Sequence, residues 1–422
     1  MTDEGARGFD TRTVHADATP DPATGSRATP IYQTTSYEFE SADHAADLYA
    51  LSAEGDVYSR ISNPTVATLE DRLASLEGGT GAVATASGMA AFDAATLVLA
   101  EGGQNVVSAS SIYGGTRAYL QHTAQRRDID ARFVDTLDYD AYADAIDDDT
   151  AFVHVETIGN PALVTPDFDR LADVAHENGV PLVVDNTFAT PALCNPIEHG
   201  ADVVWHSTTK WIHGGGTTLG GVLVDAGDFD WTPEKHPEIA DENPAYDGLR
   251  FTDRFPDAPL AAAARYRATR SLGNAQHPFD AWQTLQGLET LALRMDRHSE
   301  NAHVLADYLA DHPAVDWVTY PGLDSHETHE NAARYLADYG GMLTFGLGNY
   351  DAAKSFCESV ELASFLANVG DAKTLVIHPA STTHAQMTED EQRASGVTPD
   401  MVRVSVGIES PEDILADFEV AL

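Results

Sequence analysis

Short apolar runs separated by amphipathic stretches organise the central part of the chain. Helical spacing of apolar positions occurs at residues 65–76 and again after Ser87 through Leu99. The apolar runs that alternate with such stretches are too short for helices and lie at residues 82–84, 105–108, 152–155, 182–184 and 203–205. Continuous apolar strands that alternate with helices are typical of a mostly parallel sheet covered on both faces. The pattern therefore predicts an α/β fold.

The C-terminal part has a different pattern. A long helical pattern spans residues 278–309, and short runs at 342–346 and 402–406 predict antiparallel strands. Residues 228–255 are acidic, contain Pro and aromatic residues, and are expected to form an insertion near the domain joint.

Length and local composition predict how the chain is divided. A chain of 422 residues is too long for one simple core. Residues 1–62 are rich in Pro, Thr and Ser, which is typical of an arm rather than a core. We therefore expect an N-terminal arm (1–62), a large domain with the parallel sheet (63–257) and a smaller α+β domain (258–422).

Lys210 is the first residue that indicates chemistry. The chain has only four lysines, and this one ends an apolar, buried-looking strand and precedes a Gly-rich loop. An amine is costly to desolvate, and desolvation depresses its pKa, as an imine-forming nucleophile requires. The alternative is an ordinary lysine whose ammonium group reaches solvent from the strand end.

Asp185 favours the chemical interpretation. It ends the apolar run 180–184, and ligands of open α/β sheets bind beside the carboxyl ends of the strands. Pyridoxal 5'-phosphate (PLP) needs a lysine for its covalent link, an acid for its pyridine nitrogen and a phosphate cradle. Lys210 and Asp185 supply the first two, and the hydroxyls of Ser207 and Thr209 can donate to phosphate oxygens. The alternative for Asp185 is a helix cap or turn residue.

A phosphate cradle is also indicated after the strand at 82–84. The segment Thr85-Ala86-Ser87-Gly88-Met89-Ala90 leads from this strand into a helix. A helix N-terminus with small residues presents free backbone N–H groups to an anion. Gly88 and Met89 are the expected donors, although many strand-to-helix turns look alike.

Several segments together resemble one enzyme family over nearly the whole chain. The matching motifs are Tyr58-Ser59-Arg60, Ser87-Gly88-Met89-Ala90, Tyr113-Gly114-Gly115-Thr116, Glu156-Thr157-Ile158-Gly159-Asn160-Pro161, Val184-Asp185-Asn186-Thr187 and His206-Ser207-Thr208-Thr209-Lys210. They resemble the Cys/Met-metabolism family of PLP enzymes of fold type I. Within that family the segments 286–291, 368–372, 378–384 and 403–409 are most similar to the O-acetylhomoserine sulfhydrylases.

The resemblance implies roles for the cofactor-binding residues. Lys210 would hold the cofactor and later move protons at the substrate α-carbon. Tyr113 would stack on the pyridine ring near the leaving group. Tyr58 and Arg60 would reach the phosphate bound by a neighbouring subunit, in a homotetramer built from dimers with shared active sites; the guanidinium fork suits phosphate. The alternatives are a buried aromatic residue and a surface arginine.

The resemblance also implies substrate-binding residues. Arg403, in an alternating strand, would clamp the substrate α-carboxylate bidentately. Asn160 would contact the cofactor hydroxyl or the same carboxylate. Asn368 departs from the Ser-Leu-Gly that cystathionine-forming and cystathionine-cleaving relatives usually carry here, which leaves its role as a substrate-binding residue open.

The reaction implied is γ-replacement on O-acetyl-L-homoserine. Sulfide, or methanethiol, would replace acetate and give homocysteine, or methionine. The alternatives are a cystathionine γ-synthase or γ-lyase type of activity, an O-succinylhomoserine sulfhydrylase, and a non-catalytic binding or assembly protein that keeps the fold. Retention of Lys210, Asp185 and Arg403 disfavours the last of these.

Composition narrows the class further. The net charge is −43, from 67 acidic and 24 basic residues, which is typical of proteins from salt-accumulating microbes and argues against nucleic-acid or anionic-membrane partners. An acidic soluble enzyme is the simpler alternative. Two cysteines cannot form a disulfide framework, and no metal site is expected because His326, His329, His378 and His384 lack ligand spacing. Without a basic, apolar N-terminal leader or an 18-residue apolar run, the protein is expected to be cytoplasmic.

Overall fold

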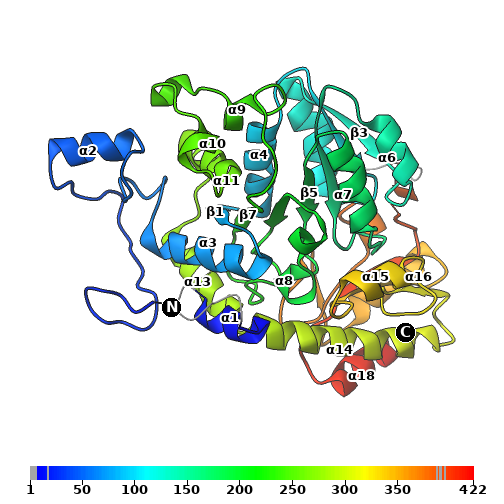
Figure 1. Cartoon of the computed structure of the whole chain (residues 1–422). Coiled ribbons are helices and arrows are strands. Elements are labelled where there is room, and N and C mark those ends of the chain that lie inside the picture. Colours follow the sequence, from blue (N-terminus) through cyan, green and yellow to red (C-terminus); the bar gives the residue numbers. More distant parts are fainter. Residues whose placement is uncertain (1–6, 17–18, 386–387, 389–391, 394–395) are drawn as a thin grey trace.

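The computed structural model describes residues 7–16, 19–385, 388, 392–393 and 396–422, and it contains two sheets (Figure 1). The larger sheet has seven strands in the order β1 (Gly81–Thr85), β7 (Gly221–Asp225), β6 (Val203–His206), β5 (Leu182–Asp185), β4 (Thr150–Glu156), β2 (Asn105–Ala109) and β3 (Asp130–Val134). All neighbours from β6 to β3 are parallel, and β7 alone runs antiparallel to both of its neighbours. The predicted mostly parallel sheet is confirmed.

Helices pack on both sheets and fill the connections between strands. They are α1 (Phe9–His15), α2 (Ala42–Tyr49), α3 (Pro64–Glu77), α4 (Gly88–Leu99), α5 (Gly114–Ala118), α6 (Tyr139–Ala145), α7 (Phe168–Glu177), α8 (Thr190–Leu193), α9 (Pro237–Ala240), α10 (Phe251–Arg254), α11 (Pro259–Ala263), α12 (Arg270–Leu272), α13 (Pro278–Leu288), α14 (Leu291–Ala310), α15 (His329–Tyr335), α16 (Tyr350–Ser359) and α18 (Pro411–Ala421).

Helices α3 and α4 pack on opposite faces of the larger sheet. Trp205 and His206 are consecutive in β6, so their side chains point to opposite faces. Trp205 packs against Phe92 of α4, with ring centroids 5.3 Å apart, whereas His206 bonds to Glu77 at the end of α3. Helix α4 therefore covers one face of the sheet and α3 the other.

Local sequence explains where α3 begins and ends. The side chain of Asn63 accepts a hydrogen bond from the backbone N–H of Thr65, and Pro64 occupies the first turn, where its missing N–H costs nothing. Gly78 ends the helix with φ +79°, a left-handed conformation that favours glycine. The expected helix at 65–76 is confirmed with one more residue at each end.

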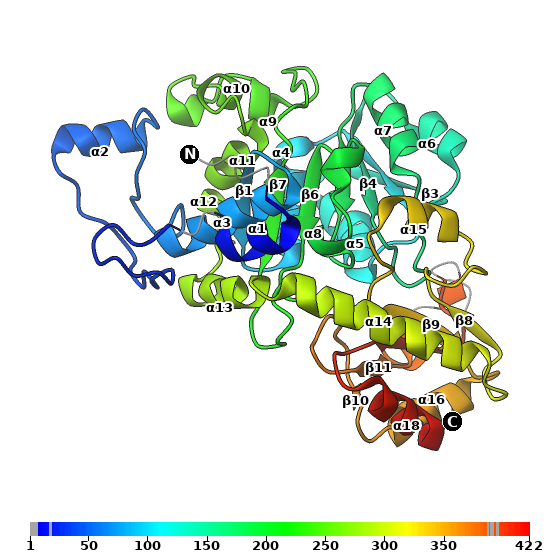
Figure 2. The same cartoon turned by 60° about the horizontal axis from the view of Figure 1, so that its bottom comes forward.

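The smaller sheet has its own apolar core, formed with α14, α16 and α18 (Figure 2). Its five strands lie in the order β10 (Ser364–Phe365), β11 (Leu375–Ile377), β12 (Met401–Ser405), β9 (Met342–Gly346) and β8 (Trp317–Thr319). The pairs from β11 to β8 are antiparallel, so the expected small α+β unit is confirmed. Helices α11 and α13 pack against the larger sheet or its helix α3, and a domain boundary at residue 257 stays a prediction.

Two expectations are wrong. The pattern at 278–309 forms two helices, because the backbone leaves the helical conformation at Thr290 (φ −116°, ψ 11°); across this break Arg294 binds the carbonyls of Gly287, Trp211 and Ile212. The segment 228–255 packs on α4 and α11, and His236 Nε2 lies 3.0 Å from the carbonyl of Ala151 near the start of β4. It therefore lies toward the amino edge of the parallel strands, not at the joint with the smaller sheet.

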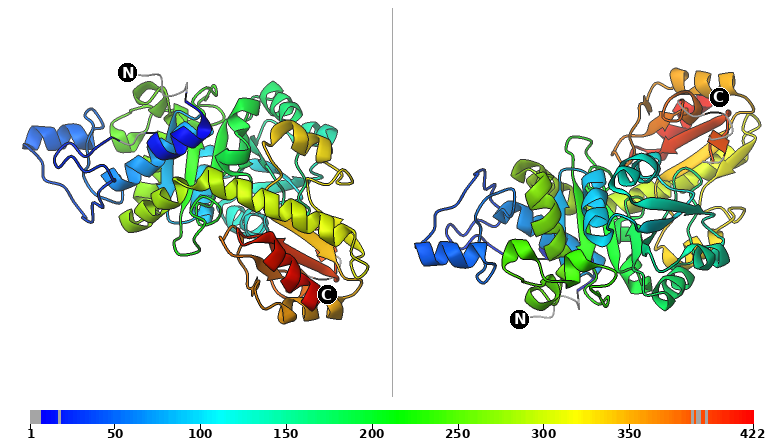
Figure 3. Two further views of the ribbon diagram at one scale, coloured as in Figure 1. Left: turned by 90° about the horizontal axis from the view of Figure 1, so that it is seen from below. Right: turned by 90° about the horizontal axis from the view of Figure 1, so that it is seen from above.

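The N-terminal residues stand apart from the sheets. Helix α1 contacts α3 and α14, whereas the segment with α2 extends away from the body of the molecule. In both views of Figure 3 this arm and the C-terminal sheet lie at opposite ends of the molecule.

Candidate active site

The carboxyl edge of the larger sheet gathers most of the predicted site residues. Thr85, Ala109, Glu156, Asp185 and His206 end the parallel strands β1, β2, β4, β5 and β6. The predicted residues Gly88, Tyr113, Asn160, Ser207 and Lys210 follow these ends within a few positions. This edge is where open α/β sheets bind their ligands.

Lys210 lies where the two sheets meet. Its Nζ donates a hydrogen bond of 2.6 Å to Oδ1 of Asn368, which follows β10 in the smaller sheet. Burial, together with the positive charge of Arg403, lowers the pKa of the Lys210 amine to about 8. The amine is therefore less basic than a surface lysine and more available as a nucleophile.

Asp185 is buried at the end of β5. Burial raises the pKa of its carboxyl to about 6, while hydrogen bonds from Thr187 and the charge of His206 oppose the rise. Its Oδ1 accepts the backbone N–H of Thr187 at 2.9 Å. In its ionised form, a carboxylate at this position can hold a proton on a ligand nitrogen.

The start of α4 lies directly against the segment that carries Lys210. A Cβ added to Gly88 would lie 2.7 Å from Cβ of Ser207, so this contact requires glycine. Ser87 caps the helix by accepting the N–H of Ala90, and the N–H groups of Gly88 and Met89 have no acceptor within the helix. The arrangement fits a bound phosphate.

The hydroxyl of Thr209 is less free than expected. Its Oγ1 lies 3.2 Å from the carbonyl of Gly220 and 3.1 Å from its backbone N, so it both donates and accepts within the loop. The backbone N–H of Ser207 donates to Oγ1 of Thr187. Donation from Thr209 to a phosphate would require its hydroxyl to turn away from Gly220.

Arg403 and Asn160 form a buried pair between the two sheets. Nη1 of Arg403, on β12, donates to Oδ1 of Asn160 at 3.3 Å, and both residues are 8 % exposed. Burial lowers the pKa of the guanidinium to about 10. Among the residues that the structure describes, Arg403 forms no ion pair. A buried cation of this kind fits a carboxylate ligand.

Tyr113 lies beside this pair and is 48 % exposed. Its backbone N–H donates to Oε1 of Glu156 at 2.6 Å, and its phenol influences the pKa of Arg403. The ring is therefore open to a ligand rather than an ordinary buried aromatic group.

Tyr58 and Arg60 have their contacts elsewhere in the same chain. The Arg60 guanidinium donates to the carbonyl of Arg270 and lies 5.3 Å from the centre of the Tyr58 ring, and Tyr58 bridges to Ser36. Both side chains are exposed or partly exposed at the base of the arm. One chain alone therefore does not bring them to its own Lys210.

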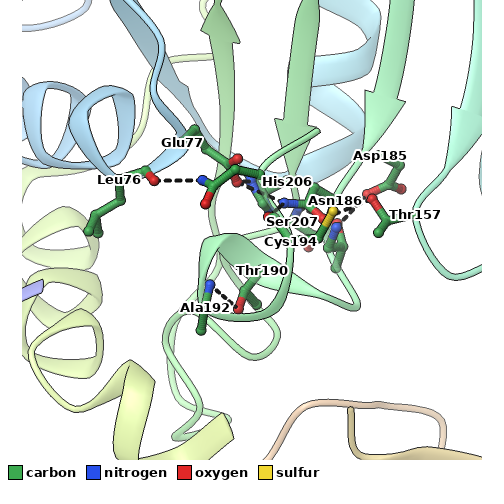
Figure 4. Close-up of polar contacts among 12 residues, drawn as sticks. Leu76, Glu77, Thr157, Asp185, Asn186, Thr190, Ala192, Cys194, His206 and Ser207 are labelled. Carbon is green, nitrogen blue, oxygen red and sulfur yellow. Dashed lines mark hydrogen bonds and ion pairs between the residues drawn. The ribbon is translucent and has the colours of Figure 1, made fainter. Parts of the chain in front are cut away.

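A buried network of polar side chains lies on the face of the larger sheet opposite Asp185 (Figure 4). No role was predicted for these side chains from the sequence. Glu77 Oε1 lies 2.5 Å from Nε2 of His206 and accepts from Nδ2 of Asn186 at 2.9 Å, while Oδ1 of Asn186 accepts from the hydroxyl of Thr157. His206 and Asn186 each adjoin a predicted site residue in sequence. Strand alternation places them on the face opposite Asp185 and could have indicated this network.

Within the described residues, no group of three or more His, Cys, Asp or Glu side chains is arranged to hold a metal ion. In the same part of the chain, no helix has the length and apolar character needed to cross a membrane.

Comparisons with known proteins agree with this geometry. A family model described as Cys/Met metabolism PLP-dependent enzyme matches residues 10–422. Homocysteine synthase of Schizosaccharomyces pombe is 50% identical over 419 residues, which cover 98% of each chain. O-acetyl-L-homoserine sulfhydrylase 1 of Thermus thermophilus is 48% identical over 98% of this chain and 99% of its own.

A solved structure is also similar over the whole chain. It is assigned as an O-acetylhomoserine (thiol)-lyase from Campylobacter jejuni, has 37% sequence identity and a TM-score of 0.95, and covers 98% of this chain and 99% of its own. That structure contains a lysine that carries a pyridoxyl phosphate group.

Proposed function

The chain belongs to the Cys/Met metabolism family of PLP-dependent enzymes, and we propose that it replaces the acetate of O-acetyl-L-homoserine by sulfide. The C–O bond to acetate breaks at the γ-carbon and a C–S bond forms there, so that homocysteine and acetate leave. With methanethiol as the nucleophile, the product is methionine. The observation that carries the proposal is the buried Arg403–Asn160 pair beside the Lys210 amine, which suits an amino-acid donor.

PLP, when bound, supplies an electron sink for negative charge at the substrate α-carbon. Lys210 holds the cofactor covalently and afterwards moves the proton at that carbon, which its lowered pKa supports. Asp185 keeps the pyridine nitrogen protonated. Gly88, Met89, Ser207 and Thr209 hold the phosphate, and Tyr113 stacks on the ring near the leaving group.

Arg403 and Asn160 orient the donor. The guanidinium binds the α-carboxylate bidentately, and the amide of Asn160 contacts the same carboxylate or the cofactor hydroxyl. Asn368 accepts a 2.6 Å hydrogen bond from the Lys210 amine in this structure, and its amide would be free to contact the donor once that amine is linked to the cofactor. Sulfide is small, so the pocket needs no second clamp for a second amino acid.

The proposal includes a shared site between subunits. Tyr58 and Arg60 of one chain reach the phosphate bound by a neighbour, in a homotetramer built from such dimers. The exposed positions of these residues at the base of a projecting arm support this arrangement. A salt-accumulating source is proposed from the acidic composition, and a cytoplasmic location remains part of the proposal.

A product assay tests the function. Purified protein is incubated with O-acetyl- or O-succinylhomoserine, each paired with sulfide, methanethiol or cysteine. We expect O-acetylhomoserine with sulfide to give the fastest turnover. Faster turnover with cysteine would place the enzyme among the cystathionine-forming members, and faster turnover with the succinyl ester would change the donor.

A further inference from the structure

Glu156 joins two parts of the site that the proposed function uses separately. It is the last residue of β4, it is buried, and it lies directly opposite Asp185 in the register of β4 and β5. Its Oε1 accepts the backbone N–H of Tyr113 at 2.6 Å, and its Oε2 accepts the backbone N–H of Asn160 at 3.0 Å. Each carboxyl oxygen therefore anchors a different loop at the carboxyl edge of the sheet.

We propose that Glu156 is a positioning residue that sets the aromatic ring of Tyr113 and the amide of Asn160 at a fixed separation. The proposal rests on the proposed function, in which Tyr113 stacks on the cofactor and Asn160 acts beside Arg403. Through this one side chain, the stacking surface and the carboxylate clamp become parts of one rigid unit. Catalysis requires such alignment, because a displacement of about 1 Å can cost about 100-fold in rate.

Burying the Glu156 carboxyl group costs free energy of folding, and this cost supports a functional role for the residue. Burial and the neighbouring Asp185 raise the pKa of Glu156 well above its ordinary value. The two backbone N–H groups bind different oxygens of Glu156, and an ionised carboxylate accepts at both, whereas glutamine has one acceptor oxygen and one NH₂ group that can only donate. A less costly neutral side chain would leave one of the two loops without its anchor.

Asp225 offers a matched control elsewhere in the chain. It is also buried, it accepts the backbone N–H groups of Gly227 and Ala261 at 3.0 and 3.1 Å, and burial raises its pKa to about 7. It ends β7, which runs antiparallel to its neighbours, so it lies at the opposite edge of the sheet from the site. Its replacement perturbs the fold in the same way without touching the site.

The test compares Glu156→Gln with Asp225→Asn in two measurements. Backbone amide hydrogen exchange of the cofactor-free protein reports the anchoring of Tyr113 and Asn160. In Glu156→Gln at least one of these amides should exchange about tenfold faster or more, as expected for a lost buried hydrogen bond. In Asp225→Asn both should keep the protection of the wild type.

Kinetics and absorbance of the holoenzyme form the second measurement. Glu156→Gln should raise KM for the amino-acid donor about tenfold and change the KM for sulfide far less, since a displaced Asn160 weakens only donor binding. The absorbance band of the bound cofactor should shift, because Tyr113 no longer stacks in the same place. Glu156→Asp keeps the charge but is one methylene shorter, so it should resemble Glu156→Gln, and it provides a second variant if the glutamine variant does not fold.

Two outcomes would overturn the proposal. One is unchanged exchange at Tyr113 and Asn160 in both Glu156 variants. The other is a rise of the donor KM in Asp225→Asn equal to that in Glu156→Gln. The KM change in the Glu156 variant would then reflect a general loss of stability rather than a displaced Asn160. Failure of the wild type to turn over O-acetylhomoserine would instead refute the proposed function, and the exchange measurement would still decide the role of Glu156.

Discussion

The amine of Lys210 lies in an environment that differs from that of the other lysines. It is half-buried, it donates to Asn368, and its pKa is lowered to about 8 by desolvation and by Arg403. The other three lysines, Lys235, Lys354 and Lys373, lie outside this environment and are partly or largely exposed.

Replacement of Lys210 by alanine should abolish covalent cofactor binding and nearly all turnover, because both depend on the same amine. Borohydride reduction of the wild type followed by peptide mapping locates the attachment directly. A pyridoxyl label on any of the other three lysines would refute the assignment.

The lowered pKa also predicts a pH dependence. Only the neutral amine attacks the cofactor aldehyde, so the rate of cofactor uptake by the cofactor-free protein should rise with pH and level off above about 8. In Arg403→Gln the inflection should move to higher pH, since the positive charge that disfavours the ammonium form is gone. Stopped-flow absorbance measures both rates, and an inflection near 10.5 in the wild type would contradict the buried environment.

At the scale of elements, the end of α3 stabilises the ends of two strands. Glu77 bonds both His206 of β6 and Asn186 beside β5, and all three side chains are fully buried. The strand ends that carry Asp185 and lead to Lys210 are thereby held together from the face opposite the Asp185 side chain (Figure 4).

Glu77→Ala should therefore lower the free energy of unfolding by about 1–3 kcal/mol, because it leaves the buried His206 imidazole without its acceptor, whereas the amide of Asn186 still donates to the carbonyl of Cys194. Denaturant unfolding measures the loss. Glu300→Ala provides the control, since it removes only the exposed pair with Arg297, and its effect should be near zero. Equal effects in the two variants would show that the buried network adds no stability.

The whole molecule presents an arm, a large sheet and a small sheet, and the site uses residues of both sheets. Lys210 meets Asn368 and Asn160 meets Arg403 across the boundary between them. Tyr58 and Arg60 lie at the base of the arm and contact neither pair.

Mixing two inactive variants tests whether subunits share sites. Arg60→Ala should weaken cofactor retention, and a mixture with Lys210→Ala under subunit exchange should recover part of the activity. A hybrid dimer can assemble one intact site from Arg60 of one chain and Lys210 of the other. Exchange, shown by mass spectrometry, without recovery of turnover would exclude the shared site.

Salt should stabilise the molecule as a whole. The chain carries about one net negative charge per ten residues, and raising the salt from 0.1 to 1 M shortens the screening length from about 10 to about 3 Å. The thermal unfolding midpoint should therefore rise with KCl over this range. A neutral osmolyte at equal osmolarity controls for exclusion effects, and an unchanged or falling midpoint in KCl would contradict the expectation.

Local patterns in the sequence were enough to predict the larger sheet and the gathering of several candidate site residues at one of its edges. Short β-branched runs and their helical connections are such patterns, and a parallel sheet brings the residues after its strands to one edge. The sequence alone therefore indicates that Lys210, Asp185, Gly88 and Ser207 lie together.

Contacts between distant segments could not be predicted in this way and depend on the packed fold. The partners of Lys210 and Arg403 lie 158 and 243 residues away in sequence. Arg294, just after the break between α13 and α14, binds the carbonyls of Trp211 and Ile212, which lie far away along the chain. The role inferred for Glu156 follows only from the two loops it binds. No local pattern encodes such contacts, because they arise from how the packed elements meet.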